Sequence, residues 1–402
     1  MTIRDKAAVV GVGATPYFRR GGSLPDTELS MACTAILGAL DDAGLKARDL
    51  DGFALYASSC DPAVVGATLG LDEVRFAVTL TSGGGGSAGA LGVAAAAIYS
   101  GLAETCVCLM TLQQAKRRLG GTVPTGASAP QMSAGPYGSS GDSSSIFRAV
   151  SGLRGPGHNY SLIAMRHMHL YGTKREHFAE ICISQRENAI RRPTSLRRDR
   201  LTLDDYFNAP MLSDPMCLFD YTMESDGAVA VILTSAERAR DLRQRPVFVM
   251  GSTHGGAGRW GPGGHSYFQA PDDYFASAGN RTVARRLYEM AGVGPADIDV
   301  ALLYDHFSPL VLMQLEDYGF CKVGEGGDFV ASGAIRYEGG SIPVNTHGGN
   351  LSEAYIIGMT HVREAVEQLR GVAVNQVEDA EIALVTGGPA SLPVSGALLR
   401  RG

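Results

Sequence analysis

An internal repeat constrains the fold of this 402-residue chain more than any other feature of its sequence. The stretch "DAGLKARDLDGFALY" (42–56) resembles "MAGVGPADIDVALLY" (290–304). The shared positions, at constant offset, are Ala43 and Ala291, Gly44 and Gly292, Asp49 and Asp297, Asp51 and Asp299, and Tyr56 and Tyr304. A second pair follows in the same order, "TSGGGGS" (81–87) and "THGGNLS" (346–352). Two matches in one order indicate a tandem duplication, in which each copy runs from a helix end through an acidic turn into a strand.

Strand-like and helical runs alternate along both copies, which predicts an α/β fold with buried sheets. Expected strands lie at 7–14, 104–112, 227–235 and 245–253, with a closing pair near 384–388 and 395–401. We place the N-terminal half at 1–243 and the C-terminal half at 244–402. The first half contains a long insertion at about 113–215, whose glycine-rich part at 120–145 is typical of a lid or an association surface.

Composition and charge exclude several classes of function. The formal net charge of -6 disfavours a general role in nucleic-acid binding. The longest apolar helical run, at 89–101, is too short to span a bilayer, and the N-terminus lacks the pattern of a signal peptide. The seven cysteines are scattered without a C-x-x-C pair, so we expect neither a metal site nor disulfides. A cytoplasmic protein that does not bind a membrane is the simplest expectation.

The arginine-rich stretch "RRPTSLRRDR" (191–200) has two interpretations. It is either a solvated surface loop or an anchor for the phosphates of a large anionic ligand such as coenzyme A. Sequence alone does not choose between them.

Candidate chemical groups follow an apolar strand in the second half. "LLYDHFSP" (303–310) ends this strand with Tyr304, Asp305 and His306, at the kind of strand end where α/β folds place ligand chemistry. "PVNTHGGNLSEAYIIG" (343–358) adds His347 and Tyr355, and we expect Tyr355 where a helix begins.

Glycine turns supply the other candidates. In "TSGGGGSAGALG" (81–92) the glycines precede an alanine-rich helix, which favours either an oxyanion site or close packing of helices. "GVGATP" (11–16) lacks the third glycine of a dinucleotide-binding turn, so a Rossmann site is not expected.

Several segments together resemble the thiolase superfamily, in particular the thiolase-like proteins of the sterol-carrier-protein type. The segments that carry the resemblance are "AVVGVGATPY", "MHLYGTKREHFAEICISQRENA", "DPMCLFDYTMESDGAVAVILTSAERA", "LYDHFSP" and "GGSIPVNTHGGNLSEAYIIG". The resemblance covers essentially the whole chain. It implies a duplicated five-layer αβαβα thiolase fold with a long loop-domain insertion, a homodimer, and acyl-CoA substrates.

The chain departs from the thiolase pattern at each catalytic position. Gly84 falls where thiolases have the nucleophilic cysteine, and the C-terminal cysteine position falls near Thr386. Tyr355 replaces the histidine of the G-H-P motif, and Tyr304 replaces that of the H-D-C-F motif. Because glycine cannot form an acyl-enzyme, thiolysis through a covalent intermediate is not expected.

These departures resemble the thiolase-like aldolases of steroid side-chain degradation. The resemblance implies retro-aldol cleavage of a β-hydroxyacyl-CoA, such as a 17-hydroxy steroid side-chain thioester, to a ketone and propionyl-CoA. It also implies no cofactor beyond the coenzyme A of the substrate, and a small OB-fold, zinc-ribbon partner that completes a heterotetramer.

The residues expected to do this chemistry form three groups. Tyr304 and Tyr355 would transfer the protons, in an order that the sequence leaves open. Asp305, His306 and His347 are candidate relay or orienting groups. The backbone at Gly387 and Gly388, with the glycines at 83–86 (Gly84 and Gly85 among them), would hold the thioester oxygen.

Two other functions stay open at this point. One is an acyltransferase or thiolase that uses a displaced cysteine. The other is a non-catalytic subunit that binds acyl-CoA or lipid and serves as a scaffold for a partner.

Overall fold

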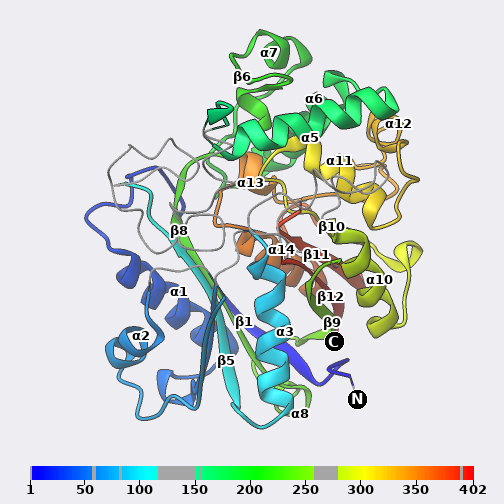
Figure 1. Ribbon diagram of the computed structural model, residues 1–402. Coiled ribbons are helices and arrows are strands. Elements are labelled where there is room, and N and C mark those ends of the chain that lie inside the picture. The colour runs from blue at the N-terminus through cyan, green and yellow to red at the C-terminus, as the bar shows by residue number, and fades with distance from the viewer. Residues whose placement is uncertain are drawn as a thin grey trace.

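The computed structural model describes residues 2–56, 60–80, 84–115, 150–153, 155–257, 279–389 and 393–402. Most of the strands in these residues join one mixed sheet, in the order β10-β11-β12-β9-β1-β8-β5-β3-β4 (Figure 1). The first half contributes β1 (Ala7–Ala14), β3 (Gly52–Tyr56), β4 (Phe76–Leu80), β5 (Thr105–Leu112) and β8 (Ser225–Ser235). The second half contributes β9 (Val247–Gly255), β10 (Val300–Leu302), β11 (Ile382–Gly387) and β12 (Val394–Arg401). The short strand β2 (Phe18–Arg19) pairs with β8. The predicted strands are therefore confirmed.

The two halves meet where β1 pairs antiparallel with β9. The predicted boundary after residue 243 lies between α8 (Ala236–Ala239) and β9. The strands of each half of the chain form one part of the sheet, which we call a half-sheet. Each half-sheet is apolar on both faces, so it needs helices on both sides.

Helices cover the half-sheets in layers. On the outer side of the first half lie α1 (Glu28–Ala43) and α2 (Pro62–Leu69). On the outer side of the second lie α10 (Asn280–Ala291) and α11 (Ser308–Asp317). Between the two half-sheets lie α3 (Gly86–Tyr99) and α14 (Met359–Arg370), whose apolar residues share one core with strands of both halves. This arrangement is the five-layer αβαβα order that the resemblance to the thiolase superfamily implies.

The α3 helix is the part of the central layer with the smallest side chains. Its sequence "GSAGALGVAAAAIY" allows strands to approach closely from both sides. A Cβ atom at Gly89 would lie 2.9 Å from the His254 ring on β9, and one at Gly86 would overlap the Tyr56 ring on β3. The glycines and alanines of this helix therefore permit the two half-sheets to pack against it.

The repeated sequence adopts the same local structure in both halves. The helices α1 and α10 each end at a left-handed glycine, Gly44 (φ 76°) and Gly292 (φ 67°). The Asp51 carboxylate then accepts the backbone N–H groups of residues 104 and 105, and the Asp299 carboxylate accepts those of residues 381 and 382. The aspartates thus fix the entry of β3 and β10, which confirms the predicted helix–turn–strand unit.

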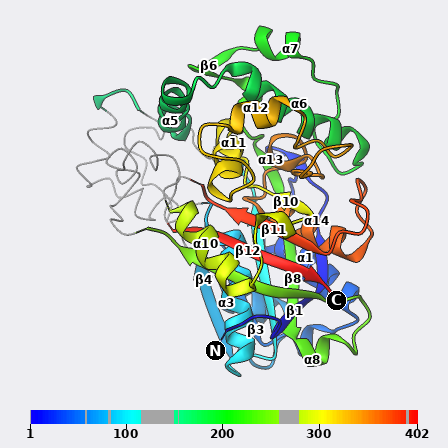
Figure 2. The ribbon, with the colours of Figure 1, turned by 90° about the vertical axis from the view of Figure 1, so that its right-hand side faces the viewer.

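The described part of the insertion forms a separate layer above the sheet. It comprises α5 (Pro156–Tyr171), α6 (Arg175–Arg191), α7 (Leu203–Asn208) and the two-stranded ribbon β6 (Met211–Ser213) with β7 (Met216–Cys217). Figures 1 and 2 show α5, α6 and α7 together at one end of the molecule. They pack with α11, α12 (Gly326–Ala331) and α13 (Gly349–Ser352) of the second half. The whole glycine-rich segment 120–145 lies in the range 116–149, outside the described residues.

Candidate active site

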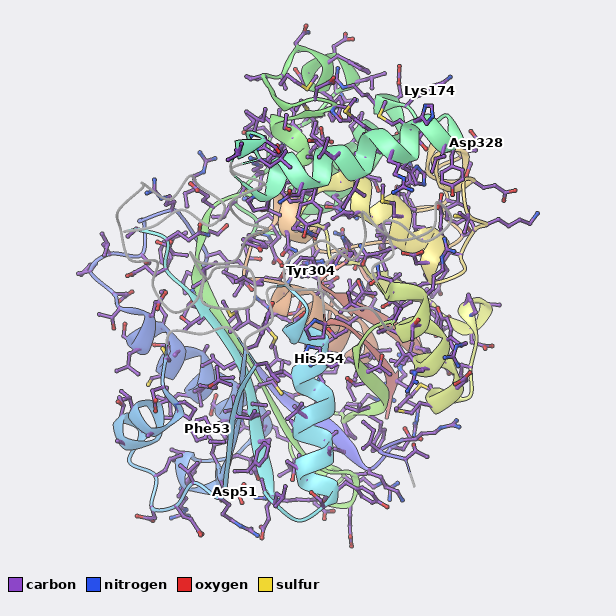
Figure 3. The ribbon with its side chains drawn as sticks, viewed as in Figure 1. Asp51, Phe53, Lys174, His254, Tyr304 and Asp328 are labelled. Carbon is purple, nitrogen blue, oxygen red and sulfur yellow. The ribbon has the colours of Figure 1, made fainter. Side chains whose placement is uncertain are left out.

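The structure brings together the two tyrosines that the sequence singles out. Tyr304 follows the end of β10, and its side chain is almost completely buried, with 1% exposed. Its hydroxyl oxygen lies 3.1 Å from that of Tyr355, so the two phenols share a hydrogen bond. Figure 3 shows Tyr304 near the centre of the molecule, whereas Asp51 lies at the opposite end of the strands.

The local structure at Tyr355 differs from the expectation that a helix begins there. The α13 helix ends at Ser352 and α14 begins at Met359, so Tyr355 lies in the turn between two helices. Ile357 (φ 44°) and Gly358 (φ 81°) adopt left-handed conformations, which stop helical hydrogen bonding across the turn. A turn, rather than a helix, therefore presents the Tyr355 hydroxyl to Tyr304.

Two side chains hold the backbone of Tyr304. Its N–H donates to the Thr386 hydroxyl of β11 (2.9 Å), and its carbonyl accepts from the Gln314 amide of α11 (2.8 Å). The Thr386 hydroxyl in turn donates to the Gln314 amide oxygen (2.6 Å). All three residues are buried, so this closed set of bonds fixes the base of the phenol from both sides.

The Tyr355 backbone is held from the first half of the chain. Its N–H donates to the hydroxyl of Ser225, at the start of β8, over 3.1 Å. The pair of phenols therefore depends on contacts that cross the boundary between the two halves.

Gly84 lies directly against the Tyr304 phenol. A Cβ atom at Gly84 would lie 3.2 Å from both the hydroxyl oxygen and the Cζ of Tyr304, and 3.2 Å from the Cα of Gly388. Gly84 also has φ +59°, which a side chain disfavours. The phenol thus takes up space next to the position where thiolases carry their cysteine.

The four predicted glycines lie around this contact. A Cβ at Gly85 would overlap the carbonyl oxygen of Pro393, and one at Gly387 would lie 3.1 Å from the Gly84 carbonyl oxygen. The glycine turn of the first half thus meets Gly387 and Gly388, at the end of β11, beside Tyr304. Residues 81–83 lie outside the described residues, so Gly83 has no described position.

Burial keeps both phenols protonated at neutral pH. It raises the pKa of Tyr304 well above 10, and the nearby Tyr355 hydroxyl raises it further. Burial also raises the pKa of Tyr355, while the hydrogen bond from Tyr304 opposes that increase. Either hydroxyl can donate the hydrogen bond that joins the two phenols.

Asp305, a candidate relay or orienting group, contacts the loop that carries Tyr355. Its carboxylate accepts the N–H groups of Asn350 (2.9 Å) and Leu351 (3.1 Å) at the start of α13 and lies 3.0 Å from Nε2 of His361. These contacts anchor the loop that carries Tyr355, and the negative charge of Asp305 also raises the pKa of Tyr355. Asp305 thus acts on the tyrosine through position and charge.

The two candidate histidines are both uncharged at neutral pH. The His306 ring stacks edge-on at 5.1 Å from the Tyr304 ring and 4.5 Å from that of Tyr160, and burial lowers its pKa to about 3. His347 is fully buried, and burial lowers its pKa well below 6.5. Its Nε2 lies 4.0 Å from a Glu353 carboxylate oxygen, and its ring contacts His361 rather than the phenol pair. His306 is therefore a direct neighbour of Tyr304, and His347 belongs to the polar layer behind the Tyr355 loop.

Comparisons with known proteins show the family to which the chain belongs. A family model described as "Thiolase C-terminal domain-like" matches residues 264–395. The chain is 37% identical over 402 residues to the 17-hydroxy-3-oxo-4-pregnene-20-carboxyl-CoA lyase of Mycobacterium tuberculosis, covering 99% of this chain and 100% of that protein. It is also 37% identical over 399 residues to the steroid side-chain-cleaving aldolase of Thermomonospora curvata, covering 98% of this chain and 97% of that protein. This chain belongs to the side-chain-cleaving aldolases of the thiolase superfamily.

Solved structures place this aldolase in the same fold. The Ltp2-ChsH2(DUF35) aldolase superposes with a TM-score of 0.88 at 34% identity, covering 100% of this chain and 99% of that one. An acetyl-CoA acetyltransferase from Syntrophomonas wolfei shares the fold with a TM-score of 0.69 at 15% identity, covering 99% and 100% of the two chains. The predicted duplicated thiolase fold is confirmed.

The cysteines of the aldolase are poor candidates for a displaced nucleophile. All seven are free thiols, and Cys106 and Cys108 are buried in β5. Burial raises the pKa of Cys106 to about 12 and that of Cys108 well above 9. A thiol with such a pKa carries almost no thiolate at neutral pH, which argues against the acyltransferase alternative.

The described part of this aldolase contains no group of three or more histidine, cysteine, aspartate or glutamate side chains arranged to hold a metal ion. Within the same residues, no helix combines the length and apolar character that crossing a membrane requires.

Sequence reasoning missed the residues that position the phenols. Ser225, Gln314 and Thr386 lie far apart in the chain and carry neutral side chains without a motif, and Thr386 stood out only as a replaced cysteine position. Helical spacing places Gln314 on α11, but the pattern does not reveal that its amide faces Tyr304.

Proposed function

We propose that this aldolase cleaves a β-hydroxyacyl-CoA by a retro-aldol reaction, without a covalent acyl-enzyme. The substrate class is a 17-hydroxy steroid side-chain CoA thioester, and the products are a 17-ketosteroid and propionyl-CoA. The names of the two 37%-identical relatives support the steroid substrate. The contact between the two phenols, 3.1 Å apart beside a glycine in place of cysteine, carries the proposal.

The reaction needs only proton transfer and charge stabilisation. The tertiary alcohol loses its proton as the bond between the hydroxyl-bearing carbon and the α-carbon breaks. The alcohol oxygen becomes the ketone oxygen, and the electron pair of the broken bond forms the enolate of the CoA thioester. A proton then adds to the α-carbon, so the overall reaction gains and loses no electrons. We therefore propose that the enzyme uses no cofactor beyond the coenzyme A of its substrate.

Two hydrogen-bonded phenols suit this sequence of steps. The alcohol proton passes to one phenol as that phenol gives its own proton to the second through their mutual hydrogen bond, and the second phenol gives its proton to the α-carbon of the enolate. Both phenols therefore start and end the turnover protonated. The backbone N–H groups of the turns at Gly84, Gly85, Gly387 and Gly388 are the proposed donors to the thioester oxygen.

We also propose a cytoplasmic homodimer that binds a small OB-fold, zinc-ribbon partner in a heterotetramer. The similar solved structure, whose name joins Ltp2 with ChsH2(DUF35), supports a partner of this kind. Light scattering coupled to size-exclusion chromatography of the aldolase, alone and mixed with that partner, would measure both assemblies. A monomer whose mass does not change on mixing would contradict the proposal.

Mass spectrometry of the products tests the reaction itself. Wild type, Tyr304→Phe and Tyr355→Phe are each incubated, with the partner, with a 17-hydroxy steroid side-chain CoA thioester. We expect 17-ketosteroid and propionyl-CoA from wild type, and a rate lower by about 100-fold to 10,000-fold in each variant. Tyr318→Phe is the matched control, because Tyr318 is also 1% exposed but its hydroxyl lies beside the Ser395 carbonyl. Unchanged rates in both active-site variants would refute the roles of the phenols, and tight CoA binding without products would favour the scaffold alternative.

A further inference from the structure

Three arginines from distant parts of the chain meet beside the loop that carries Tyr355. This arginine cluster consists of Arg19 on β2, Arg186 on α6 and Arg197 in the segment after α6. Arg19 donates through Nη2 to the carbonyl of Leu196 (3.4 Å), next to Arg197. Arg186 donates through Nε to the Ser352 hydroxyl (3.0 Å), and the Arg197 backbone N–H donates to the Ser352 carbonyl (3.1 Å). Three positive charges thus converge on one short stretch of backbone.

The cluster has no negative partner in direct contact among the described residues. Arg186 donates its remaining described bond to the backbone carbonyl of Asp199 (3.0 Å), and Arg197 donates to the carbonyl of Leu351 (3.5 Å). The acceptors of the cluster are therefore neutral oxygens. The Asp199 charge favours the Arg186 cation from a distance but forms no ion pair with it in the described structure.

Arg192, in the same segment, shows that the fold can neutralise a buried arginine. It is 2% exposed, and its guanidinium contacts three carboxylates, those of Glu353, Glu364 and Glu367. The arginine-rich stretch thus contains one fully paired cation and, only five residues later, a cation without a counter-charge. This contrast indicates that the missing negative charge comes from outside the described residues.

Burial makes the unpaired state costly. Arg186 is only 5% exposed and Arg197 is half-buried. Burial, together with the charges of Arg186 and Arg19, lowers the pKa of Arg197 to about 10. Two of the three like charges, Arg186 and Arg197, are held partly away from water, which is destabilising unless an anion neutralises them, and the arginine guanidinium is the group best suited to bind phosphate.

The cluster is directly linked to the active-site loop. The Leu196 N–H donates to the Glu353 carbonyl (2.9 Å), two residues before Tyr355. On the other side, Arg19 pairs across β2 and β8 with Ser225, whose hydroxyl accepts the Tyr355 N–H. An anion bound to the cluster would therefore lie beside the segment that positions Tyr355.

We propose that Arg19, Arg186 and Arg197 form a phosphate-binding site, and that the phosphates of the CoA thioester occupy it. The second part rests on the proposed function, because it assumes an acyl-CoA substrate. This site gives the arginine-rich stretch the anchoring role rather than that of a solvated loop.

Calorimetric titration with CoA, without turnover, tests the site independently of the cleavage reaction. The proteins are wild type, Arg197→Gln, Arg197→Lys and Arg19→Gln, and the probes are CoA, pantetheine and inorganic phosphate. Arg200→Gln is the matched control, since Arg200 is an exposed arginine of the same stretch. Arg19 is also exposed, so its variant will fold even if a change at Arg197 disturbs packing.

We expect the dissociation constant for CoA to rise about tenfold to a hundredfold in Arg197→Gln and Arg19→Gln, the effect of one lost charge-assisted hydrogen bond. Arg197→Lys should recover part of this loss, Arg200→Gln should match wild type, and pantetheine binding should not change. Weaker binding of inorganic phosphate with unchanged CoA binding would overturn the assignment to CoA and leave a free-phosphate site. Unchanged binding of both probes would overturn the site. If the variants lose CoA binding while the wild-type enzyme binds CoA but cleaves no steroid thioester, only the proposed reaction is contradicted.

Discussion

Replacing Gly84 with alanine should slow turnover, because the new methyl group would press on the Tyr304 phenol. The Cβ would lie 3.2 Å from the Tyr304 hydroxyl oxygen, which is closer than ordinary carbon–oxygen contact. The backbone at Gly84 also has φ +59°, so alanine adds strain. The variant therefore changes two quantities, the stability of the fold and the position of the phenol.

The two effects have different sizes. A side chain in the left-handed region costs about 1–2 kcal/mol of folding free energy. The contact is relieved if the phenol moves by a few tenths of an ångström, which lengthens its 3.1 Å hydrogen bond to Tyr355. Since a misplacement of about 1 Å can cost about 100-fold in rate, we expect kcat to fall about threefold to tenfold.

A second glycine separates strain from contact. Gly70 has φ +69°, and a Cβ there would meet nothing within 4 Å. Gly70→Ala should therefore lose similar stability in thermal denaturation but keep the wild-type kcat for propionyl-CoA release. If Gly84→Ala retains full activity, or if Gly70→Ala loses as much, the argument that the phenol requires the glycine is wrong. Gly84→Cys should show the same loss and no thiolysis, because the phenol lies against the position of the new side chain.

Three further predictions concern the groups around the phenols. Thr386→Val removes the hydroxyl that accepts the Tyr304 N–H and should lower kcat about tenfold with little change in KM. Thr386→Ser keeps the hydroxyl and should have a kcat near that of wild type. Equal losses of kcat in both variants would argue against a role of the hydroxyl in positioning Tyr304. Arg192→Met leaves three carboxylates without their buried cation and should cost about 3–5 kcal/mol in urea denaturation. Arg191→Met removes only surface contacts, the pair with Glu338 and the packing over the Tyr337 ring, and should cost less than about 1 kcal/mol. Burial lowers the pKa of His306 in the folded protein to about 3. The unfolded chain therefore takes up the His306 proton first as the pH falls below about 6.5. The contribution of the neutral His306 to stability is complete above that pH and falls by about 1.4 kcal/mol per pH unit towards pH 3. His306→Phe should flatten this acid slope in thermal denaturation at pH 7, 6 and 5, and an unchanged slope would assign it to other groups.

Local rules account for the parts of this protein that the sequence predicted. Gly44 and Gly292 end their helices because only glycine adopts left-handed φ without strain, and Asp51 and Asp299 follow at the same offset because both carboxylates bind the backbone of a neighbouring strand. These short-range requirements are visible as a repeat, and the repeat implies two half-sheets. The two tyrosines were identifiable from the sequence because each replaces a catalytic histidine within a recognisable motif.

Tertiary packing decided what the side chains contact. Tyr355 was expected at a helix start, but the left-handed Ile357 and Gly358 make a turn there, and isoleucine gives no local warning of that conformation. Asp305 is a candidate relay or orienting group in the sequence, and only the fold shows that the N-terminus of α13 packs onto its carboxylate.

Contacts across the layers set the geometry of the phenol pair. Ser225, Gln314 and Thr386 come from β8, α11 and β11, and their neutral side chains fit many surroundings equally well. The sequence alone therefore determined the duplicated fold and the identity of the two tyrosines, because both follow from short-range backbone rules and motif positions. Only the tertiary structure decided that the two hydroxyls meet beside Gly84 and that three arginines converge beside their loop, because each of these contacts joins residues more than fifty positions apart.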